Sequence, residues 1–335
     1  MTINWTKLLC AASVAIVTIA ATASVAEAAQ PLGPGWCKGF KIRFFAGGDE
    51  GDTFGAVVAA GGVQAGVDTG ADVEVVYSGW NSEKMVQQFR EAVAQQVGGV
   101  AIYGFPGTAA LTPVAEDAQK AGVLVNYMNS PVPDVTKEFG GGFVGVHDLA
   151  AQGKALADEA IKEFGLKSGD KAAVFVPINQ KERSAREFGT VDEFKAHGMT
   201  VEEIPNKDTY GGEPNQAIPV VTAVIAKIPD LKVIAYAGGQ ELGNAEAYMT
   251  AAGKKAGEVI NIGFDASPQI IDGFDKGWIQ LTADQQPFLQ GYLPVVNLCQ
   301  QHVLGLTPID VETGAGFINK DNYKTVGALA QRGLR

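Results

Sequence analysis

Residues 99–127, GVAIYGFPGTAALTPVAEDAQKAGVLVNY, contain one complete strand–helix–strand unit. The segments 99–103 and 123–127 are short, mainly apolar runs, and residues 108–121 between them have the length of a helix. A strand that is apolar along its whole length is buried on both faces, which is typical of a parallel sheet covered by helices. This unit therefore predicts an α/β fold with a parallel sheet.

The same alternation continues on both sides of this unit. Further strands are predicted at 42–46, 73–77, 171–176, 200–204, 233–237, 259–263 and 278–283. Further helices are predicted at 53–69, 83–97, 149–164, 184–196, 215–227, 242–252, near residue 270 and, as the last helix, at 288–304. A Gly- and Pro-rich connection at 130–142 divides the pattern into two halves. We predict two doubly wound parallel-sheet lobes, with a ligand site in the cleft between them, beyond the carboxyl ends of the strands.

The charge and composition exclude several classes of protein. The 335 residues include 26 basic and 37 acidic side chains, which gives a formal net charge of −11. Nucleic acids and anionic membranes attract clusters of basic residues, so we predict no nucleic-acid partner and no binding to a membrane surface. With 46% hydrophobic residues the chain is too apolar for intrinsic disorder, and its length allows about two domains.

The first 28 residues have the features of a secretory signal peptide. Residues 1–7 carry one positive charge, residues 8–21 form an uncharged apolar run, and Ala26-Glu27-Ala28 supplies small residues around a cleavage point. A transmembrane anchor is the alternative, but the uncharged run is shorter than the roughly 20 residues that a span needs. We therefore predict cleavage after about residue 28 and secretion to the periplasm.

Cleavage leaves two cysteines, Cys37 and Cys299. In an oxidising compartment they are able to pair if the fold brings them together, and two buried free thiols are the alternative. Two thiols alone do not make a zinc site, and the three histidines show no ligand spacing with them. We therefore predict no metal site and no cofactor.

Motifs that would indicate an enzyme are weak or missing. Residues 47–52, GGDEGD, follow the first strand as a phosphate-binding loop does, but they lack its spacing and its Lys, and their three carboxylates would repel a phosphate. The G-x-S-x-G, H-E-x-x-H and C-x-x-C motifs do not occur. The pair His147-Asp148 is interpreted as a helix cap and linker. We predict no catalytic residue and a protein that is not an enzyme.

Several short motifs occur in an order that resembles a known family. They are IGFDASP at 262–268, LTADQQP at 281–287, DTF at 52–54, AGVLVN at 121–126 and RSAR at 183–186. Together with the leader and the doubled α/β pattern, they resemble the type I periplasmic sugar-binding proteins of ABC importers, the ribose-binding group, over about residues 40–316. The resemblance implies two lobes that are joined by a multi-strand hinge and close on a small carbohydrate.

The resemblance also implies which residues bind the ligand. Carried over position by position, the set is Asp52, Phe54, Asn129, Arg186, Tyr210, Gln240, Asp265 and Gln285. Three of these residues allow another interpretation: Asp52 as the cap of the following helix, Phe54 as a core residue of that helix, and Arg186 as a solvated charge. Arg186 is also able to exchange roles with Arg183.

Two departures from the family pattern argue against ribose as the ligand. Gly238-Gly239 replace the usual Asn-Asp, and Ser130 replaces an Arg that ribose binders commonly carry. The remaining residue types suit a polyol, because carboxylates, amides and Arg bind hydroxyl groups and a flat aromatic ring covers the C–H face of a sugar. The resemblance therefore implies a neutral sugar or polyol of undetermined stereochemistry.

The implied function is that of a monomeric periplasmic solute-binding protein, which delivers the sugar to the permease of an ABC importer. One alternative is a protein that presents a furanose-like signal of the autoinducer-2 type to a receptor, and another is a secreted α/β hydrolase. The implied lobes are residues 37–145 with 286–314 and residues 146–285 with 315–335. In this arrangement Cys37 and Cys299 share a lobe, so a disulfide between them is feasible.

Overall fold

The computed structural model describes residues 32–177, 184–210, 212–314 and 316–335. The chain divides into two units, Met1–Gly33 and Pro34–Arg335, and the second contains every helix and strand of the described residues. The predicted signal peptide at 1–28 lies outside the described residues. Among the described residues, none of the helices combines the length and the apolar character that a membrane crossing needs.

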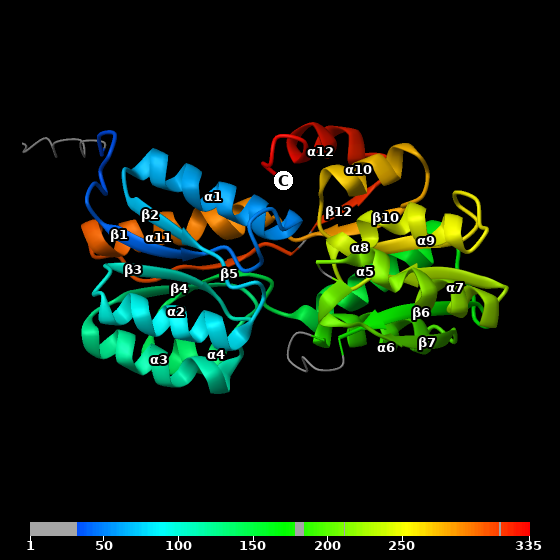
Figure 1. Cartoon of the computed structure of the whole chain (residues 1–335), viewed down its shortest axis with the longest axis horizontal. Helices are drawn as coiled ribbons and strands as arrows, with labels where there is room; N and C mark the ends of the chain where they lie inside the picture. Colours follow the sequence, from blue (N-terminus) through cyan, green and yellow to red (C-terminus); the bar gives the residue numbers. More distant parts are fainter. Residues whose placement is uncertain (1–31, 178–183, 211, 315) are drawn as a thin grey trace, which may run out of the picture. The chain divides into compact units, whose positions relative to one another are not determined.

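The first sheet is built from six strands that run parallel to one another. They are β1 (Lys41–Phe45), β2 (Asp72–Val76), β3 (Gly99–Tyr103), β4 (Leu124–Asn129), β5 (Gly142–Gly145) and β11 (Asp310–Glu312), in the order β11-β5-β4-β3-β1-β2. The helices α1 (Thr53–Thr69) and α11 (Pro287–Leu304) pack together on one face, and α2 (Ser82–Ala94), α3 (Thr108–Ala121) and α4 (Pro133–Phe139) cover the other (Figure 1). Because both faces are covered, β3 is buried along its whole length.

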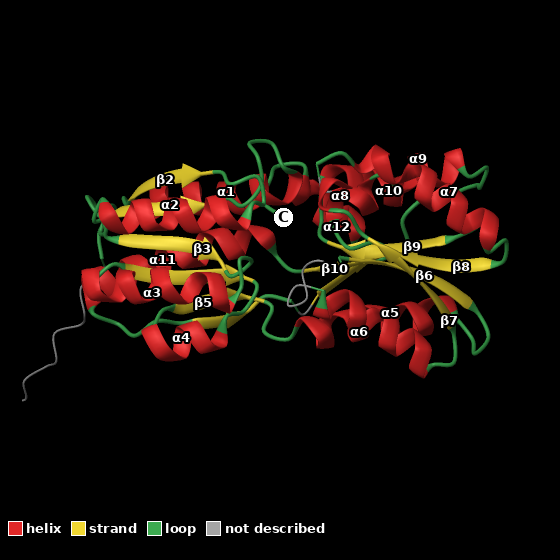
Figure 2. Ribbon diagram, turned by 60° about the horizontal axis from the view of Figure 1, so that its bottom comes forward, coloured by secondary structure: helices red, strands yellow, loops and turns green. Residues whose placement is uncertain are grey.

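The second sheet also has six strands within the described residues. They are β6 (Lys171–Val176), β7 (Thr200–Pro205), β8 (Leu231–Ala235), β9 (Ile260–Phe264), β10 (Leu281–Asp284) and β12 (Gly316–Asn319), in the order β12-β10-β9-β8-β6-β7. One face carries α5 (Leu149–Phe164) and α6 (Ala185–Ala196), and the other carries α7 (Ile218–Lys227), α8 (Gly239–Gly243), α9 (Ala245–Ala251), α10 (Pro268–Asp275) and α12 (Tyr323–Ala330) (Figure 2). Among the strands that the structure describes in this sheet, only β12 runs antiparallel to its neighbour, β10. Two short 3-10 helices, η1 (Asp208–Tyr210) and η2 (Pro214–Ala217), precede α7.

The two sheets are connected by three passages of the chain. The chain leaves the first sheet after β5, returns from β10 into α11, and leaves again between β11 and β12. The prediction of two doubly wound lobes joined by a multi-strand hinge is therefore confirmed, since each sheet has its own hydrophobic core and its own helices. The lobe boundaries inferred from the resemblance stay a prediction.

Several segments differ from the sequence-based expectation. The helix predicted at 242–252 is divided into α8 and α9, and the strands β5, β11 and β12 were not predicted. The connection at 130–142 contains the helix α4, in which Pro133 occupies the first turn and Gly140 follows the last residue with a positive φ of 79°. Its composition predicted a loop, but Pro at the start and Gly at the end of a segment also bound a helix. The helix at 287–304 is not the last one, because α12 follows β12.

A disulfide bond joins Cys37 to Cys299, with 5.7 Å between the two Cα atoms. Cys37 lies just before β1, Cys299 lies in α11, and both belong to the hydrophobic core of the first lobe. The predicted sharing of one lobe is confirmed, and the alternative of two free thiols is wrong. The bond connects the segment before β1 to α11, a helix of the first lobe that follows β10 of the second lobe in the sequence.

Candidate ligand-binding site

Five of the predicted site residues lie at the carboxyl ends of strands or in the segments that follow them. Asp52 and Asn129 lie beyond β1 and at the end of β4 in the first lobe, whereas Gln240, Asp265 and Gln285 follow β8, β9 and β10 in the second. Ligands of open parallel sheets gather beyond the carboxyl ends of the strands. Hydrogen bonds connect these five residues into two groups, which are described in turn.

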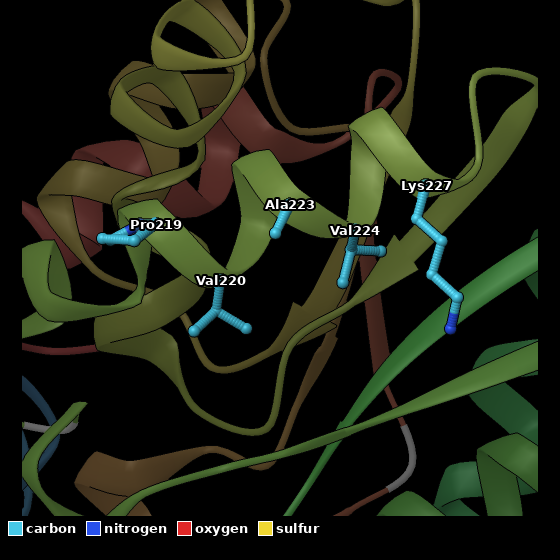
Figure 3. Close-up of a pocket in the computed structure, with 5 residues that line it drawn as sticks. All are labelled: Pro219, Val220, Ala223, Val224 and Lys227. Carbon is cyan, nitrogen blue, oxygen red and sulfur yellow. The ribbon is translucent and has the colours of Figure 1, made fainter.

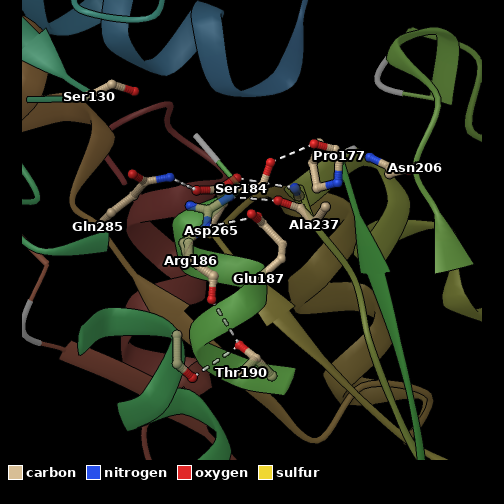
Figure 4. Close-up of polar contacts among 12 residues, drawn as sticks. Ser130, Pro177, Ser184, Arg186, Glu187, Thr190, Asn206, Ala237, Asp265 and Gln285 are labelled. Carbon is tan, nitrogen blue, oxygen red and sulfur yellow. Dashed lines mark hydrogen bonds and ion pairs between the residues drawn. The ribbon is translucent and has the colours of Figure 1, made fainter. Parts of the chain in front are cut away.

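The first group is centred on Asp265, which is 7% exposed. Its carboxylate accepts hydrogen bonds from the Gly239 N–H at 3.1 Å and from the side-chain amide of Gln285 (Figure 4). Gln285 in turn accepts from Asn129 Nδ2 at 3.1 Å, and the same nitrogen donates to Gln290 Oε1 at 3.0 Å. The chain of contacts therefore runs from the second lobe, through the β10–α11 passage, to the first lobe.

Backbone geometry helps to place this group. Asn129 and Asp265 have positive φ angles of 67° and 76°, a left-handed conformation that Asn and Asp tolerate better than other non-glycine residues. A Cβ atom at position 239 would lie 2.9 Å from Asp265 Oδ2, so Gly239 is the residue that allows the backbone N–H to approach the carboxylate. Left-handed residues concentrate where a structure directs side chains into a site.

The second group is centred on Asp52, whose carboxylate accepts three hydrogen bonds. Asp52 Oδ1 accepts from the Gly55 N–H at 2.6 Å and thereby caps α1. Asp52 Oδ2 accepts from Trp80 Nε1 at 3.1 Å and from Gln240 Nε2 at 2.9 Å. The capping interpretation of Asp52 is confirmed, and the contact with Gln240 also places Asp52 opposite the second lobe.

Trp80 belongs to a group of four aromatic rings in the first lobe. Phe54 is 9% exposed, and its ring centroid lies 6.2 Å from that of Trp80 and 6.4 Å from that of Tyr103. Trp80 also meets Tyr103 and Phe105 edge to face, at 5.1 and 5.8 Å. Phe54 therefore packs in the hydrophobic core, as its alternative interpretation predicted, and the half-buried Trp80 is the ring that is bonded to Asp52.

Tyr103 is fully buried within this aromatic group. Burial raises the pKa of its hydroxyl well above the usual value, and the carboxylates of Asp52 and Asp265 raise it further. The hydroxyl therefore stays protonated and donates to the carbonyl oxygen of Ala46 at 3.4 Å.

Arg186 occupies the first turn of α6 and is 5% exposed. Its guanidinium donates to the Ala237 carbonyl at 2.6 Å and to Glu187 at 3.1 Å (Figure 4). It also lies 3.8 Å from the centre of the Phe264 ring. The interpretation as a solvated charge is wrong, because the guanidinium is buried and partnered. Arg183, the alternative to it, lies outside the described residues.

Tyr210 is placed apart from the two hydrogen-bonded groups. It is 1% exposed and belongs to the core of the second lobe, where its ring meets the edge of Phe175 at 6.4 Å. A buried tyrosine in a core contributes mainly through packing. Its role in ligand binding stays a prediction that these contacts do not support.

Sequence reasoning missed Trp80, Gln290 and Thr313. Trp80 follows the carboxyl end of β2, which is a signal that was available in the sequence. Gln290 lies in the first turns of α11, and its side-chain amide donates a hydrogen bond to Thr313 Oγ1 at 3.0 Å. Thr313 lies in the segment between β11 and β12. No local pattern connects residues 290 and 313, so only the fold reveals this contact.

Two cavities of the described residues lie away from these groups. One, of about 340 Å³, is an open apolar hollow along α7, lined by Pro219, Val220, Ala223, Val224 and Lys227 (Figure 3). The other, of about 170 Å³, lies in the first lobe beside α3 and β4. Neither includes a residue of the two hydrogen-bonded groups, and no cluster of metal-ligating side chains occurs in the described part of the chain.

The sheets, their three connections and the polar residues at the strand ends define a two-lobed binding protein. A model of the periplasmic binding protein domain matches residues 44–304. This match covers well over half of the chain, so the chain belongs to the periplasmic binding protein family. The family resemblance inferred from the sequence is confirmed.

Individual proteins support the same fold. The chain is 22% identical over 253 residues to the xylose/arabinose-binding protein XylF of Sulfolobus acidocaldarius. The aligned residues make up 72% of this chain and 61% of XylF, so the chain spans less than two thirds of this curated relative. A carbohydrate transporter from Acidothermus cellulolyticus, solved with myo-inositol, is 24% identical with a TM-score of 0.74, covering 88% of this chain and 99% of that one. A solute-binding protein from Agrobacterium vitis, solved with α-D-tagatopyranose, is 23% identical with a TM-score of 0.74, covering 87% and 98%.

Proposed function

We propose that this chain is the solute-binding protein of an ABC importer, and that it binds a neutral sugar or polyol between its two lobes. The single observation that carries the proposal is the chain of side-chain contacts from Asp265 through Gln285 to Asn129. It brings a carboxylate and two amides from both lobes together at the carboxyl ends of the strands. The family match and the sugars named for the similar structures support the same conclusion.

The chemistry of this region suits hydroxyl groups. An Asp accepts hydrogen bonds, whereas Asn and Gln both donate and accept, so together they satisfy the donors and acceptors of a polyol. Asp52 and Asp265 contribute two negative charges, and the guanidinium of Arg186 already binds Glu187 and a backbone carbonyl. An anionic ligand would therefore be repelled, and a neutral one is favoured. We assign Asn129, Asp265 and Gln285 as ligand contacts, whereas the side-chain amide of Gln240 donates to Asp52.

Export to the periplasm fits the described structure. A buried disulfide between Cys37 and Cys299 is typical of proteins that fold in an oxidising compartment. We propose that residues 1–28 direct export and are removed, and that the mature protein acts as a monomer without catalytic activity. We also propose lobe boundaries at 145/146, 285/286 and 314/315, since the chain passes from one sheet to the other near these positions.

The proposal is tested by thermal unfolding of the mature protein with a panel of pentoses, hexoses, inositols, alditols, furanoses and sugar acids. A ligand at about 100 times its Kd stabilises the folded state by about 2.7 kcal/mol, so a specific sugar raises Tm by several degrees. Calorimetric titration then gives Kd and stoichiometry. A panel in which no neutral sugar or polyol raises Tm, or in which only sugar acids do, would contradict the proposal.

Two variants, one in the proposed site and one control, test whether the rise in Tm depends on the site. Asp265→Asn changes the proposed site, and Val67→Ala changes an exposed position on α1, where the side chain is 72% exposed. The sugar-induced rise in Tm shrinks in the first variant and persists in the second. Incubation of the sugar with the protein, followed by chromatography, reports whether the ligand is released unaltered, as transport requires and hydrolysis does not.

A further inference from the structure

Asp52 is the meeting point of three hydrogen-bond donors from different parts of the fold. The Gly55 N–H belongs to α1, Trp80 follows β2, and Gln240 lies in α8 of the second lobe. The two side-chain donors share one oxygen, Oδ2, at 3.1 Å from Trp80 Nε1 and 2.9 Å from Gln240 Nε2. The Trp80–Asp52–Gln240 chain therefore crosses from one lobe to the other without involving the connecting segments.

Trp80 is held firmly in the first lobe. Its φ of 54° is left-handed, which costs a non-glycine residue about 1–2 kcal/mol. Its backbone N–H donates to the Gly47 carbonyl at 3.1 Å. A Cβ atom at Gly47 would lie 2.5 Å from the indole ring, and one at Gly48 would lie 2.8 Å from Nε1, so the ring rests directly on the glycine backbone. Tyr103 meets it edge to face, and these contacts aim the indole N–H at Asp52.

Asp52 has little capacity left for a ligand. A carboxylate offers about four acceptor positions. The helix cap uses one on Oδ1, and Trp80 and Gln240 use two on Oδ2. At most about one acceptor position is left for a sugar hydroxyl, so most of the hydrogen bonding of Asp52 is directed to the protein itself.

We propose that Trp80 is a positioning residue that orients Asp52 toward Gln240, and that Trp80, Asp52 and Gln240 form a latch that stabilises the closed arrangement of the two lobes. The role of the latch in ligand affinity rests on the proposed function. The Asp52–Gln240 bond joins different lobes, so it exists only while they are together, whereas the Trp80–Asp52 and Gly55–Asp52 bonds lie within one lobe. A contact that only one conformation contains shifts the equilibrium toward that conformation. A larger closed population strengthens the apparent affinity for a ligand that binds the closed form.

The test is a double-mutant cycle on the mature protein. Trp80→Phe keeps an aromatic ring but removes the N–H, and Gln240→Met keeps the length of the side chain but removes the amide. Each single variant is expected to raise the Kd of the sugar identified by the Tm panel about tenfold, which is typical of losing one charge-assisted hydrogen bond. Because both variants break the same latch, the double variant also binds about tenfold more weakly, not about a hundredfold.

A measurement without ligand separates the latch from sugar binding. Small-angle X-ray scattering of the sugar-free protein is expected to give a larger radius of gyration for both single variants than for the unsubstituted protein. Trp36→Phe is the matched control, because Trp36 is half-buried against the core of the first lobe, and it leaves the radius and Kd unchanged. If no sugar binds at all, the proposed function fails while the scattering still decides the latch.

Several results would overturn the latch. Unchanged scattering in Gln240→Met does so whatever Trp80→Phe shows, and therefore also if Trp80→Phe fails to fold. Multiplicative losses of affinity in the double variant would show that Trp80 and Gln240 act independently, for example by contacting the sugar separately. The positioning role of Trp80 would then be wrong.

Discussion

Replacement of Asp265 tests the core of the site most directly. The carboxylate is 7% exposed, accepts from the Gly239 N–H and the Gln285 amide, and is carried by a residue with a φ of 76°. Asp265→Ala removes both acceptor contacts and leaves two buried donors, at about 1–3 kcal/mol each. The left-handed backbone adds about 1 kcal/mol for Ala, so the expected loss of folding free energy is about 3–7 kcal/mol.

Asp265→Asn is the comparison that makes this prediction sharp. Asn tolerates the left-handed conformation and keeps one acceptor oxygen, so of the Gly239 N–H and the Gln285 amide only one loses its partner. The expected loss of unfolding free energy is about 1–2 kcal/mol. Sugar affinity is expected to fall about 10- to 100-fold in Asp265→Asn, because the ligand loses a charged acceptor.

Urea denaturation followed by tryptophan fluorescence measures the unfolding free energies, and calorimetric titration measures Kd. Asp275→Asn is the control, because Asp275 is an exposed aspartate at the end of α10, and it is expected to stay within about 0.5 kcal/mol of the unsubstituted protein. Equal destabilisation by Asn and Ala would refute the reasoning from acceptors and backbone. Unchanged affinity in Asp265→Asn would show that the site lies elsewhere.

Three further outcomes follow from other contacts. Cys299→Ser opens a link between residues that are 262 positions apart, for which chain entropy gives about 5–6 kcal/mol, so urea denaturation should show a loss of about 3–5 kcal/mol. Reductant should shift the curve of the unsubstituted protein and leave that of the variant unchanged, and an unsubstituted protein insensitive to reductant would contradict the bond. Burial alone would lower the pKa of His147, but its hydrogen bonds to two β11 carboxylates raise this pKa above 6.5. The protonated imidazole therefore stabilises the fold fully below pH 6.5, and this contribution is lost as the pH rises through the raised pKa. The Tm of His147→Gln should therefore lie further below that of the unsubstituted protein at about pH 5.5 than at about pH 9. The difference in stability stays under about 1 kcal/mol because the imidazole is 41% exposed, and equal Tm differences at the two pH values would contradict the ion pairs. Gly153→Ala would place a Cβ atom 1.7 Å from the Arg186 carbonyl, so it should separate α5 from α6 and lower Tm by several degrees, and an unchanged Tm would disprove this close packing.

Most of the architecture was predictable because its signals are local. The helices at 53–69, 108–121 and 149–164 and the strands at 99–103 and 171–176 have the predicted bounds. Their apolar spacing and their glycine stops lie within the segments themselves. The α4 helix was missed because the Pro and Gly that bound it are equally typical of a loop.

The site was predicted in part for a similar reason. Asp265 and Gln285 directly follow buried strands, so their position at the open end of a sheet is a local property of the sequence. Trp80 also follows a strand, but nothing near it in the sequence indicates that its indole N–H meets Asp52. The family resemblance implied that Tyr210 binds the ligand, and the packing of its ring in the core of the second lobe does not support that role.

The two α/β lobes and the types of side chain at their strand ends are encoded locally, because hydrophobic periodicity acts over one helix or strand at a time. Which of these side chains meet depends on the folded chain as a whole. Asp52 and Gln240 are 188 residues apart, and Asn129 and Gln285 are 156 apart, yet each pair is hydrogen-bonded. Such pairs depend on how the sheets stack and where the chain crosses between them, and no local pattern encodes that geometry.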